Sequence, residues 1–204
     1  MTDVGSLPPE MMTVSGLVIV APLPLSVPNA TDHPALTEAI GGRVNAIDEL
    51  AASCREAGVP VIHIWYIVDA GASGLKQNAP LFQGVKEADA LVRGTWGAAP
   101  ADGLEPQDGD HVVEKMRMNG FYNTRLDILL RGLGVETLII TGAWTNMSIE
   151  HTARHAADAG YRAVVASDGT STVDDEWQNA ALNYAMQNVA TVGTCAEITA
   201  ALSA

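Results

Sequence analysis

The chain alternates short apolar, β-branched runs with longer segments of helical periodicity, and this alternation limits the folds that it can adopt. The run GLVIVA at 16–21 is apolar throughout, which is typical of a strand buried on both faces. The segment 37–57 spaces its apolar side chains three and four residues apart, which places them on one face of a helix. The pattern predicts a parallel sheet covered by helices on both faces.

The same alternation continues to the end of the chain. With 16–21, six strands are predicted, the others at 60–68, 111–115, 136–142, 161–166 and 190–192. After 37–57, helices are predicted at 81–91, 123–131 (capped by Asn123), 147–159, 174–187 and 195–201. We therefore expect a single domain over 1–204, with 1–12 as an extended N-terminal arm. Its fold class is α/β, with three layers (α/β/α) around a doubly wound, mainly parallel six-stranded sheet.

Ligands bind such sheets at the carboxyl ends of the strands, close to the switch in strand order. The expected binding region is therefore formed by the segments that follow Ala21, Ile64, Lys115 and Gly142. We call this side of the sheet the ligand edge. The segment 70–110 is a long connection rich in Gly, Pro and Ala, and connections of this length usually have a function.

Composition excludes several classes of function. The net charge is −13, from 24 acidic and 11 basic side chains, which disfavours binding to nucleic acids and to anionic membranes. No apolar run reaches the roughly 18 residues of a membrane-spanning helix, and 1–12 has no Lys or Arg, unlike a secretory signal. Two cysteines, Cys54 and Cys195, make no disulfide framework, so we expect a cytoplasmic protein.

Three features between 112 and 171 carry chemistry. Lys115 closes a strand and points toward the ligand edge, and the turn GAWTN at 142–146 leads a strand into a helix. Ser148 lies in the first turn of that helix, where the helix dipole and unpaired backbone N–H groups favour negative charge. Such N–H groups can form an oxyanion hole.

Two motifs in this region resemble the isochorismatase-like superfamily, also called the cysteine hydrolases. One is K-x-R-x-x-x-F-x-x-T, formed by Lys115, Arg117, Phe121 and Thr124, and the other is T-G-x-x-T-x-x-x-x-E-x-T-A over 141–153. The likeness covers roughly 14–202. It implies hydrolysis of a C–N bond in a small amide, imide, lactam or carbamoyl compound, without a cofactor, by a homo-oligomer.

The resemblance also implies a catalytic Asp, Lys and Cys. Carried over, the Lys is Lys115, Ser148 occupies the Cys position, and Ala21 occupies the Asp position. It further implies an oxyanion hole from the N–H groups of Trp144 and Ser148, and a cis peptide bond between Ala143 and Trp144. One of the three catalytic side chains is therefore retained, and we expect slow turnover or none.

Several readings of this incomplete set stay open. A paralogue could bind a small molecule without turning it over, or Cys→Ser and Asp→Ala could have been introduced to trap a substrate. A serine–lysine hydrolase needs a neutral Lys115 as base, which burial without a carboxylate favours. The isochorismate reaction is disfavoured because the chain lacks the aspartate that performs it. A structural role through an oligomer face is a further alternative.

Aromatic and charged side chains near the ligand edge are the candidates for substrate binding: Trp65, Trp96, Arg117, Phe121, Tyr122 and Trp144. Packing in the core is the alternative for Trp65 and Phe121, and surface pairing is the alternative for Arg117.

No metal site is expected. His151 and His155 are spaced like a zinc pair but lack the glutamate of H-E-x-x-H, and they are predicted on a solvated helix face. The segment 63–72 lacks the Asp-x-His loop through which some nicotinamidases hold a metal. Cys54 is predicted to lie in the core and Cys195 to be structural.

Overall fold

The computed structural model describes residues 16–20 and 34–202, and for 17–20 and 34–42 it describes the backbone alone. Within this part of the chain, six strands form one sheet in the order β3-β2-β1-β4-β5-β6, and each neighbouring pair is parallel. Their bounds are β1 Gly16–Val20, β2 Val61–Tyr66, β3 His111–Lys115, β4 Thr137–Ala143, β5 Arg162–Ser171 and β6 Thr191–Gly193. The predicted α/β fold with a doubly wound parallel sheet is confirmed. The predicted arm at 1–12 lies outside the described residues.

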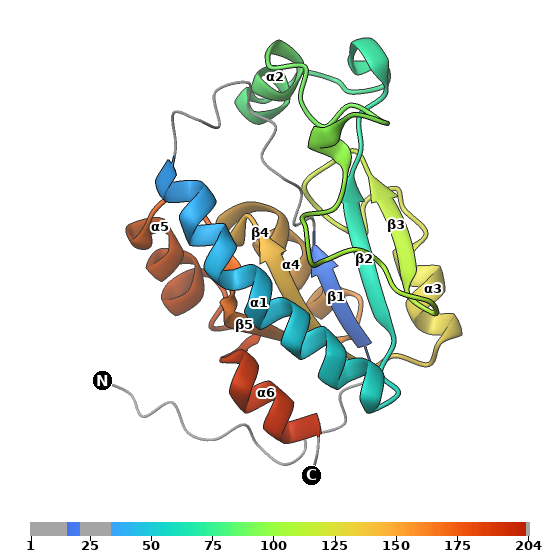
Figure 1. The fold of residues 1–204 in the computed structure, drawn as a ribbon, viewed down its shortest axis with the longest axis vertical. Helices are drawn as coiled ribbons and strands as arrows, with labels where there is room; N and C mark the ends of the chain where they lie inside the picture. Colours follow the sequence, from blue (N-terminus) through green and yellow to red (C-terminus); the bar gives the residue numbers. More distant parts are fainter. Residues whose placement is uncertain (1–15, 21–33, 203–204) are drawn as a thin grey trace.

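Helices cover both faces of the sheet (Figure 1). On one face lie α1 (Pro34–Glu56) and α6 (Cys195–Leu202), which contact each other and β5. Their core includes Ile47, Ala51 and Cys54, as the helical spacing predicts, and Cys195 is also buried here. On the other face lie α3 (Leu126–Gly132) and α4 (Glu150–Asp158), with α5 (Asp175–Ala180) beside them.

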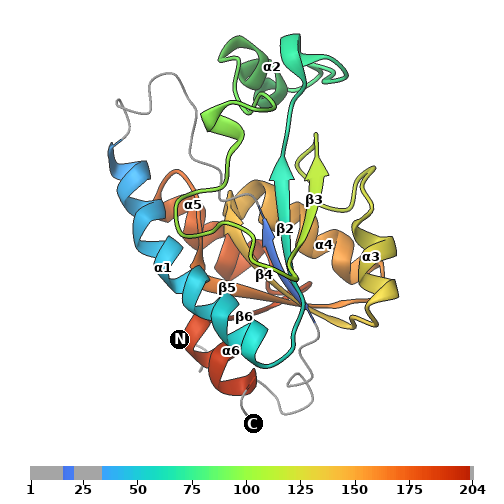
Figure 2. The same ribbon diagram turned by 45° about the vertical axis from the view of Figure 1, so that its right-hand side comes forward.

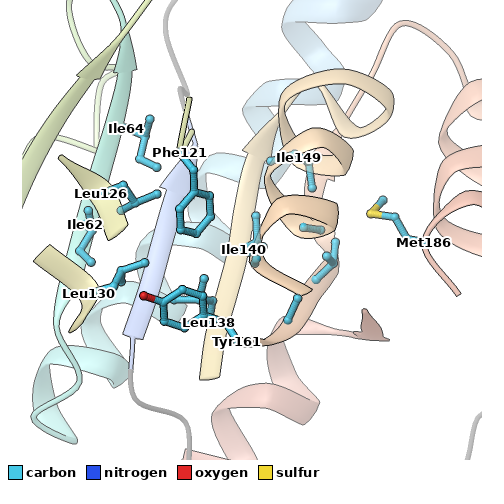
Figure 3. Packing of buried hydrophobic residues seen from close by; sticks show 14 of the residues in the cluster. Ile62, Ile64, Phe121, Leu126, Leu130, Leu138, Ile140, Ile149, Tyr161 and Met186 are labelled. Carbon is cyan, nitrogen blue, oxygen red and sulfur yellow. The ribbon is translucent and has the colours of Figure 1, made fainter. Parts of the chain in front are cut away.

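A core of buried hydrophobic side chains lies between the sheet and the helices α3 and α4 (Figure 3). Alternate residues of each strand point to the same face, so Leu138 and Ile140 of β4 enter this core while Ile139 enters the one under α1. Ile149, at the start of the α4 region, is fully buried against them. Burial of each such side chain contributes roughly 1.5–3 kcal/mol, so the residues that flank the site are held firmly.

Two of the predicted helices begin or end in a wider turn than expected. The helix expected at 147–159 consists of a π-helical turn, η5 (Thr145–Ile149), followed by α4. The helix expected at 174–187 is α5 followed by a second π-helical turn, η6 (Ala181–Ala185). Such turns occur often at functional sites, and η5 contains Ser148.

The predicted cap at Asn123 is wrong. Asn123 has φ of +55°, a left-handed conformation that asparagine tolerates, and α3 begins after Arg125. The Thr124 hydroxyl instead accepts a hydrogen bond from the Leu126 N–H (3.2 Å) and donates one to the Gly120 carbonyl (2.7 Å).

The long segment that follows β2 first extends beyond the carboxyl ends of β2 and β3 and then runs back to the start of β3 (Figure 2). It contains η3 (Ala70–Ala72), α2 (Pro80–Glu87) and η4 (Trp96–Ala98). A small apolar cluster holds it to the sheet, formed by Tyr66, Val68, Leu75, Phe82 and Val85. Among the helices of the described residues, none has the length and apolar composition that spanning a bilayer requires.

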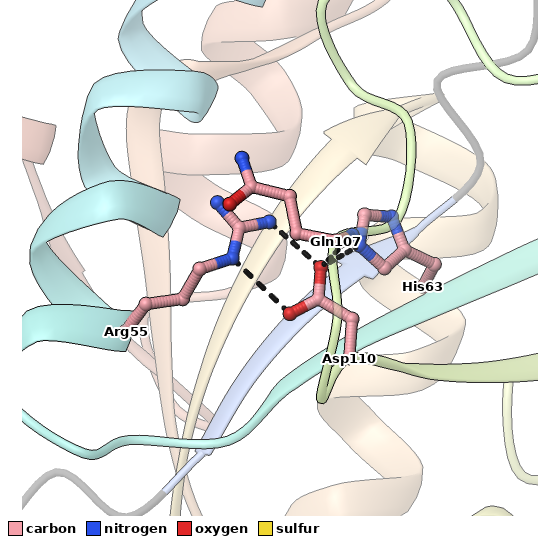
Figure 4. Close-up of polar contacts among 4 residues, drawn as sticks. All are labelled: Arg55, His63, Gln107 and Asp110. Atoms are coloured by element: carbon pink, nitrogen blue, oxygen red, sulfur yellow. Dashed lines mark hydrogen bonds and ion pairs between the residues drawn. The ribbon is translucent and has the colours of Figure 1, made fainter.

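A buried polar cluster lies at the opposite end of the strands, at their amino termini, where Asp110 precedes β3 (Figure 4). We refer to this side of the sheet as its amino edge. Asp110 accepts hydrogen bonds from Arg55 (2.7 and 3.1 Å), from the Gln107 N–H (2.9 Å) and from His63 (2.9 Å). Burial favours a higher pKa for Asp110, but these donors outweigh it and lower the pKa. Burial lowers the pKa of His63, against the opposing effect of Asp110. We call Arg55, His63 and Asp110 the amino-edge cluster.

Candidate active site

The site is built around a contact between two side chains that are 33 residues apart in the sequence. Lys115 is the last residue of β3, and Ser148 lies in η5, directly after β4. The Lys115 Nζ and the Ser148 Oγ are 2.8 Å apart, a hydrogen bond. Both residues are buried, with exposed fractions of 3% and 6%. Of the three predicted catalytic positions, the structure describes Lys115 and Ser148. It brings their side chains into contact.

Neutral groups surround the Lys115 ammonium. Its Nζ also donates to the Met118 carbonyl, and it lies 5.7 Å from the centre of the Tyr66 ring. Burial lowers the pKa of Lys115 from 10.5 to about 7, because desolvation disfavours the charged form. Among the residues that the structure describes, no carboxylate forms a hydrogen bond or ion pair with Lys115 or Ser148.

The turn before Ser148 has an unusual backbone. The peptide bond between Ala143 and Trp144 is cis, which confirms the expectation drawn from the resemblance. The Trp144 carbonyl accepts hydrogen bonds from the N–H groups of Met147 (3.0 Å) and Ile149 (3.2 Å), which close the turn. Trp144 and Ser148 therefore belong to one compact turn, while the oxyanion hole assigned to their N–H groups stays a prediction.

A buried glutamine supports this turn from behind. The Thr145 hydroxyl donates to the Gln178 Oε1 (2.6 Å), and the Gln178 Nε2 donates to the carbonyl and hydroxyl oxygens of Thr170 (3.1 and 3.2 Å). The Thr172 hydroxyl donates in turn to the Asn146 side chain. Sequence reasoning missed this network. The available signal was the position of Gln178 in its helix. It lies one helical turn after Asp174, which caps α5, and one helical turn before the buried Leu182.

The position predicted for the missing carboxylate, Ala21, lies outside the described residues. It follows Val20, the last residue of β1, and Val20 pairs with Ile64 on one side and with Gly142 on the other. The strand order switches between these neighbours, so the described end of β1 lies where such folds bind ligands.

The predicted substrate-binding residues separate into two groups. Trp144 is half-buried in the turn that holds Ser148, and Trp65, also half-buried, precedes Tyr66. In contrast, Trp96 and Tyr122 are 69% and 61% exposed. The structure does not bring these two side chains into the Lys115–Ser148 contact.

Phe121 and Arg117 are engaged elsewhere. Phe121 lies in the core, with its ring stacked on His155 at 4.7 Å, which is the packing role given above as the alternative. Arg117 donates to the Lys76 carbonyl (3.1 Å) and stacks on the Phe82 ring (4.4 Å). It therefore ties the long segment to the strand end that carries Lys115.

The two helical histidines behave differently from each other. His151 is exposed, as predicted, whereas the solvated position predicted for His155 is wrong, because its ring stacks on Phe121 and bonds the Asn119 side chain (3.1 Å). In the described part of the chain, no three His, Cys, Asp or Glu side chains are grouped so that they could hold a metal ion.

Comparisons with known proteins found matches over most of the chain. The model of the isochorismatase domain family matches residues 30–197. The ureidoacrylate amidohydrolase RutB of Methylorubrum extorquens is 36% identical over 146 residues, which cover 65% of this chain and 58% of that protein. RutB of Rhizobium rhizogenes is 34% identical over 181 residues, 78% of this chain and 72% of that protein. The match thus spans less than two thirds of the length of the Methylorubrum extorquens relative.

Solved structures match over nearly the whole chain. An isochorismatase family protein from Desulfovibrio vulgaris has a TM-score of 0.82 at 29% identity, covering 94% of this chain and 99% of its own. A cysteine hydrolase from Pseudomonas syringae pv. phaseolicola has a TM-score of 0.85 at 24% identity, covering 100% and 99%, which bears on the fold alone.

Proposed function

The chain belongs to the isochorismatase domain family, and from this premise we propose that its site is that of a C–N bond hydrolase with an incomplete set of catalytic groups. The substrate class is a small amide, imide, lactam or carbamoyl compound. The names of the RutB relatives, which are amidohydrolases, support the bond type. Turnover by the chain as written is slow or absent.

The observation that carries the proposal is the buried contact between Lys115 and Ser148. A cysteine beside a lysine ammonium ionises readily and is a strong nucleophile, and a carboxylate nearby can move protons to the leaving amine. Ser148 supplies a hydroxyl that ionises far less readily, and position 21 supplies a methyl group. In this proposal the contact between the Lys and nucleophile positions is kept, while the thiol and the acid–base carboxylate are absent from the sequence at 148 and 21.

The remaining parts of the site fit acyl transfer. Ser148 lies at the start of the helical region η5–α4, where backbone N–H groups and the helix dipole stabilise negative charge. We assign the N–H groups of Trp144 and Ser148 to the oxygen that becomes negative when a nucleophile attacks the carbonyl carbon. Trp144 also provides an aromatic wall beside them.

Serine–lysine hydrolysis is the second candidate, and the lowered pKa of Lys115 favours it. Neutral Lys115 would take the Ser148 proton as the Oγ attacks the carbonyl carbon, and would then return a proton to the leaving nitrogen. Its activity should rise as Lys115 deprotonates near pH 7. Replacing Lys115 with Ala should abolish any activity of the unmodified chain, and unchanged activity would exclude this route.

The proposal is tested by restoring the two groups, in the double variant Ala21→Asp with Ser148→Cys. A screen of small amides, ureido and carbamoyl compounds with ammonia detection should show turnover that the unmodified chain lacks. The matched control is Ala21→Asn with Ser148→Cys, which has the same shape without the charge and should be about 10²–10⁴-fold slower.

A double variant that binds these compounds but does not turn any of them over would contradict the hydrolase proposal. It would favour the alternative, a paralogue that binds a small molecule without catalysis. We also propose that the chain is cytoplasmic, because both cysteines are buried and unpaired, which suits a reducing compartment. We further propose that it forms a homo-oligomer, which sedimentation of the purified chain would measure.

A further inference from the structure

We propose that the site as it stands binds a small carboxylate, which accepts hydrogen bonds from Lys115, Ser148 and Tyr66 and supplies the negative charge that the described part of the site lacks. The proposal uses the site of the proposed function but requires no turnover there. The ligand class is a monoanion with a planar acid group, such as the carboxylate that amide hydrolysis itself produces.

The first support is that, among the described residues, the Lys115 ammonium contacts neutral partners only. The groups that contact it are the Met118 carbonyl, the Ser148 hydroxyl and the face of the Tyr66 ring. A buried charge without a counter-charge is unfavourable, and the protein relieves this by releasing the proton from Lys115. An anion that entered beside Lys115 would allow the lysine to keep its charge.

The second support is a buried donor that has no partner. Tyr66 of β2 pairs in register with Lys115 of β3, so the two side chains leave the sheet on the same face. Tyr66 is 6% exposed, and its hydroxyl has no hydrogen-bond partner within the described ranges. A buried hydroxyl loses its hydration, and an acceptor brought by a ligand would compensate for that loss.

The carboxylates on the neighbouring elements are already paired, and the Arg117 guanidinium bonds neutral oxygens. On β3, Glu114 forms an ion pair with Arg93 (2.7 Å), and after β3 Arg117 bonds the Lys76 carbonyl. On α4, Glu150 pairs with Arg154 (3.0 Å).

Of the histidines in η5–α4, His151 is exposed and His155 bonds Asn119. None of these groups supplies a counter-charge to Lys115, whose pKa is lowered by desolvation alone.

The same features select a carboxylate over other ligands. Lys115 is the buried cation of the described site and balances one negative charge, while Arg117, whose charge also acts on Tyr66, bonds the Lys76 carbonyl and the Asn78 side chain. A neutral amide of the same shape would accept hydrogen bonds but would leave the Lys115 charge unbalanced. Binding is coupled to proton uptake, because the anion requires the charged form of a lysine whose pKa is about 7.

The test compares acetate with acetamide, which match in size and differ in charge. Binding to the full chain is measured by ligand-observed NMR or calorimetry between pH 6 and 9. Acetate should bind at least tenfold more tightly than acetamide at pH 6, and its affinity should fall about tenfold per pH unit above pH 7, while acetamide binding stays constant. Equal binding of the two, or acetate binding that does not change with pH, would overturn the proposal.

Variants then locate the ligand. Lys115→Met should abolish acetate binding, and Tyr66→Phe should weaken it several-fold without changing the pH dependence. Ala21→Asp should also abolish it, because an intramolecular carboxylate would take the place of acetate. Unchanged acetate binding in both Lys115→Met and Ala21→Asp would contradict the proposal. Restored turnover in the double variant with no acetate binding by the unmodified chain would contradict this inference and leave the proposed function intact.

Discussion

The two edges of the sheet each bury a small group of polar side chains, and the two groups have opposite compositions. At the amino edge, the Asp110 carboxylate accepts hydrogen bonds from Arg55, His63 and a backbone N–H. At the carboxyl edge, Lys115 and Ser148 contact each other with no carboxylate among the described residues. In the amino-edge cluster the Asp110 carboxylate has donors on both oxygens, although the Arg55 Nη1 and the His63 Nδ1 have no partner among the described residues. The Lys115–Ser148 pair, in contrast, has no described counter-charge at all.

This difference separates a structural role from a functional one. Buried polar groups that satisfy each other hold elements together, and here they join α1, β2 and the start of β3. Buried groups that do not satisfy each other reduce the stability of the fold, and strongly perturbed groups of this kind concentrate at functional sites. The comparison predicts that mutations at the two edges change stability in opposite directions.

Removing the carboxylate at the amino edge should have the largest effect. Asp110→Asn leaves the half-buried Arg55 without its counter-charge and weakens the hydrogen bonds from His63 and the Gln107 N–H, so the free energy of unfolding should fall by about 3–5 kcal/mol in urea titrations. The control is Glu114→Gln, which breaks an exposed ion pair with Arg93 and should change stability far less. Equal effects of the two variants would mean that the amino-edge cluster is not a structural element.

The Lys115 charge should destabilise the chain in a pH-dependent way. The pKa of Lys115 is about 7 in the folded chain and 10.5 in the unfolded chain, so between these values the unfolded chain binds more protons and stability rises with pH. From pH 7 to 8.5 the rise should be about 2 kcal/mol. Lys115→Met removes the group and should abolish it, so the difference between the two proteins isolates Lys115. Parallel pH profiles would contradict burial of this charge.

The glutamine behind the site should matter less. Gln178→Leu removes the hydrogen bonds to Thr145 and Thr170 and should lower the free energy of unfolding by about 1.5 kcal/mol. Gln187→Leu is the matched control, because this glutamine is exposed and bonds a single carbonyl. If Gln178 positions Ser148, the restored hydrolase should also lose kcat in Gln178→Leu, whereas Gln187→Leu should leave kcat unchanged.

The smallest effect on stability is expected for the Tyr66 hydroxyl, which has no hydrogen-bond partner among the described residues. Tyr66→Phe removes this unsatisfied group and should leave stability unchanged or increase it by up to about 1 kcal/mol. Tyr161→Phe is the control, since the Tyr161 hydroxyl donates to Asp127 (2.8 Å) and its loss should cost about 1 kcal/mol. A larger loss for Tyr66→Phe than for Tyr161→Phe would show that the Tyr66 hydroxyl is satisfied within the chain.

Sequence reasoning recovered what depends on local pattern. The strand 111–115 has the predicted bounds, and Lys115 and Ser148 meet because parallel strands end at one edge of the sheet. The solvated position of His151 was also predicted, and Ile149, Thr152, Ala153 and Ala156 of the η5–α4 region are all buried. Periodicity is sufficient for such features because it follows from the geometry of one element.

What sequence reasoning missed depends on contacts between distant segments. Arg55, His63 and Asp110 come from three elements, and no spacing in the sequence indicates that they meet. The π-helical turn at 145–149 also escaped notice, because its apolar spacing resembles that of an ordinary helix start. The exposure of Trp96 and Tyr122 depends on how the long segment after β2 and the turn before α3 pack.

Titration of Lys115 by NMR tests most directly whether the site holds a buried cation without a carboxylate. In protein labelled with ¹³C-lysine, the Cε signals of Lys76 and Lys86, which are exposed, serve as internal references. The Lys115 signal should titrate near pH 7 in the unmodified chain, and near its ordinary range in Ala21→Asp, because a carboxylate favours the charged form. A Lys115 midpoint close to 10.5 in the unmodified chain, or no change of the midpoint in Ala21→Asp, would contradict the claim that Lys115 is a buried cation without a carboxylate.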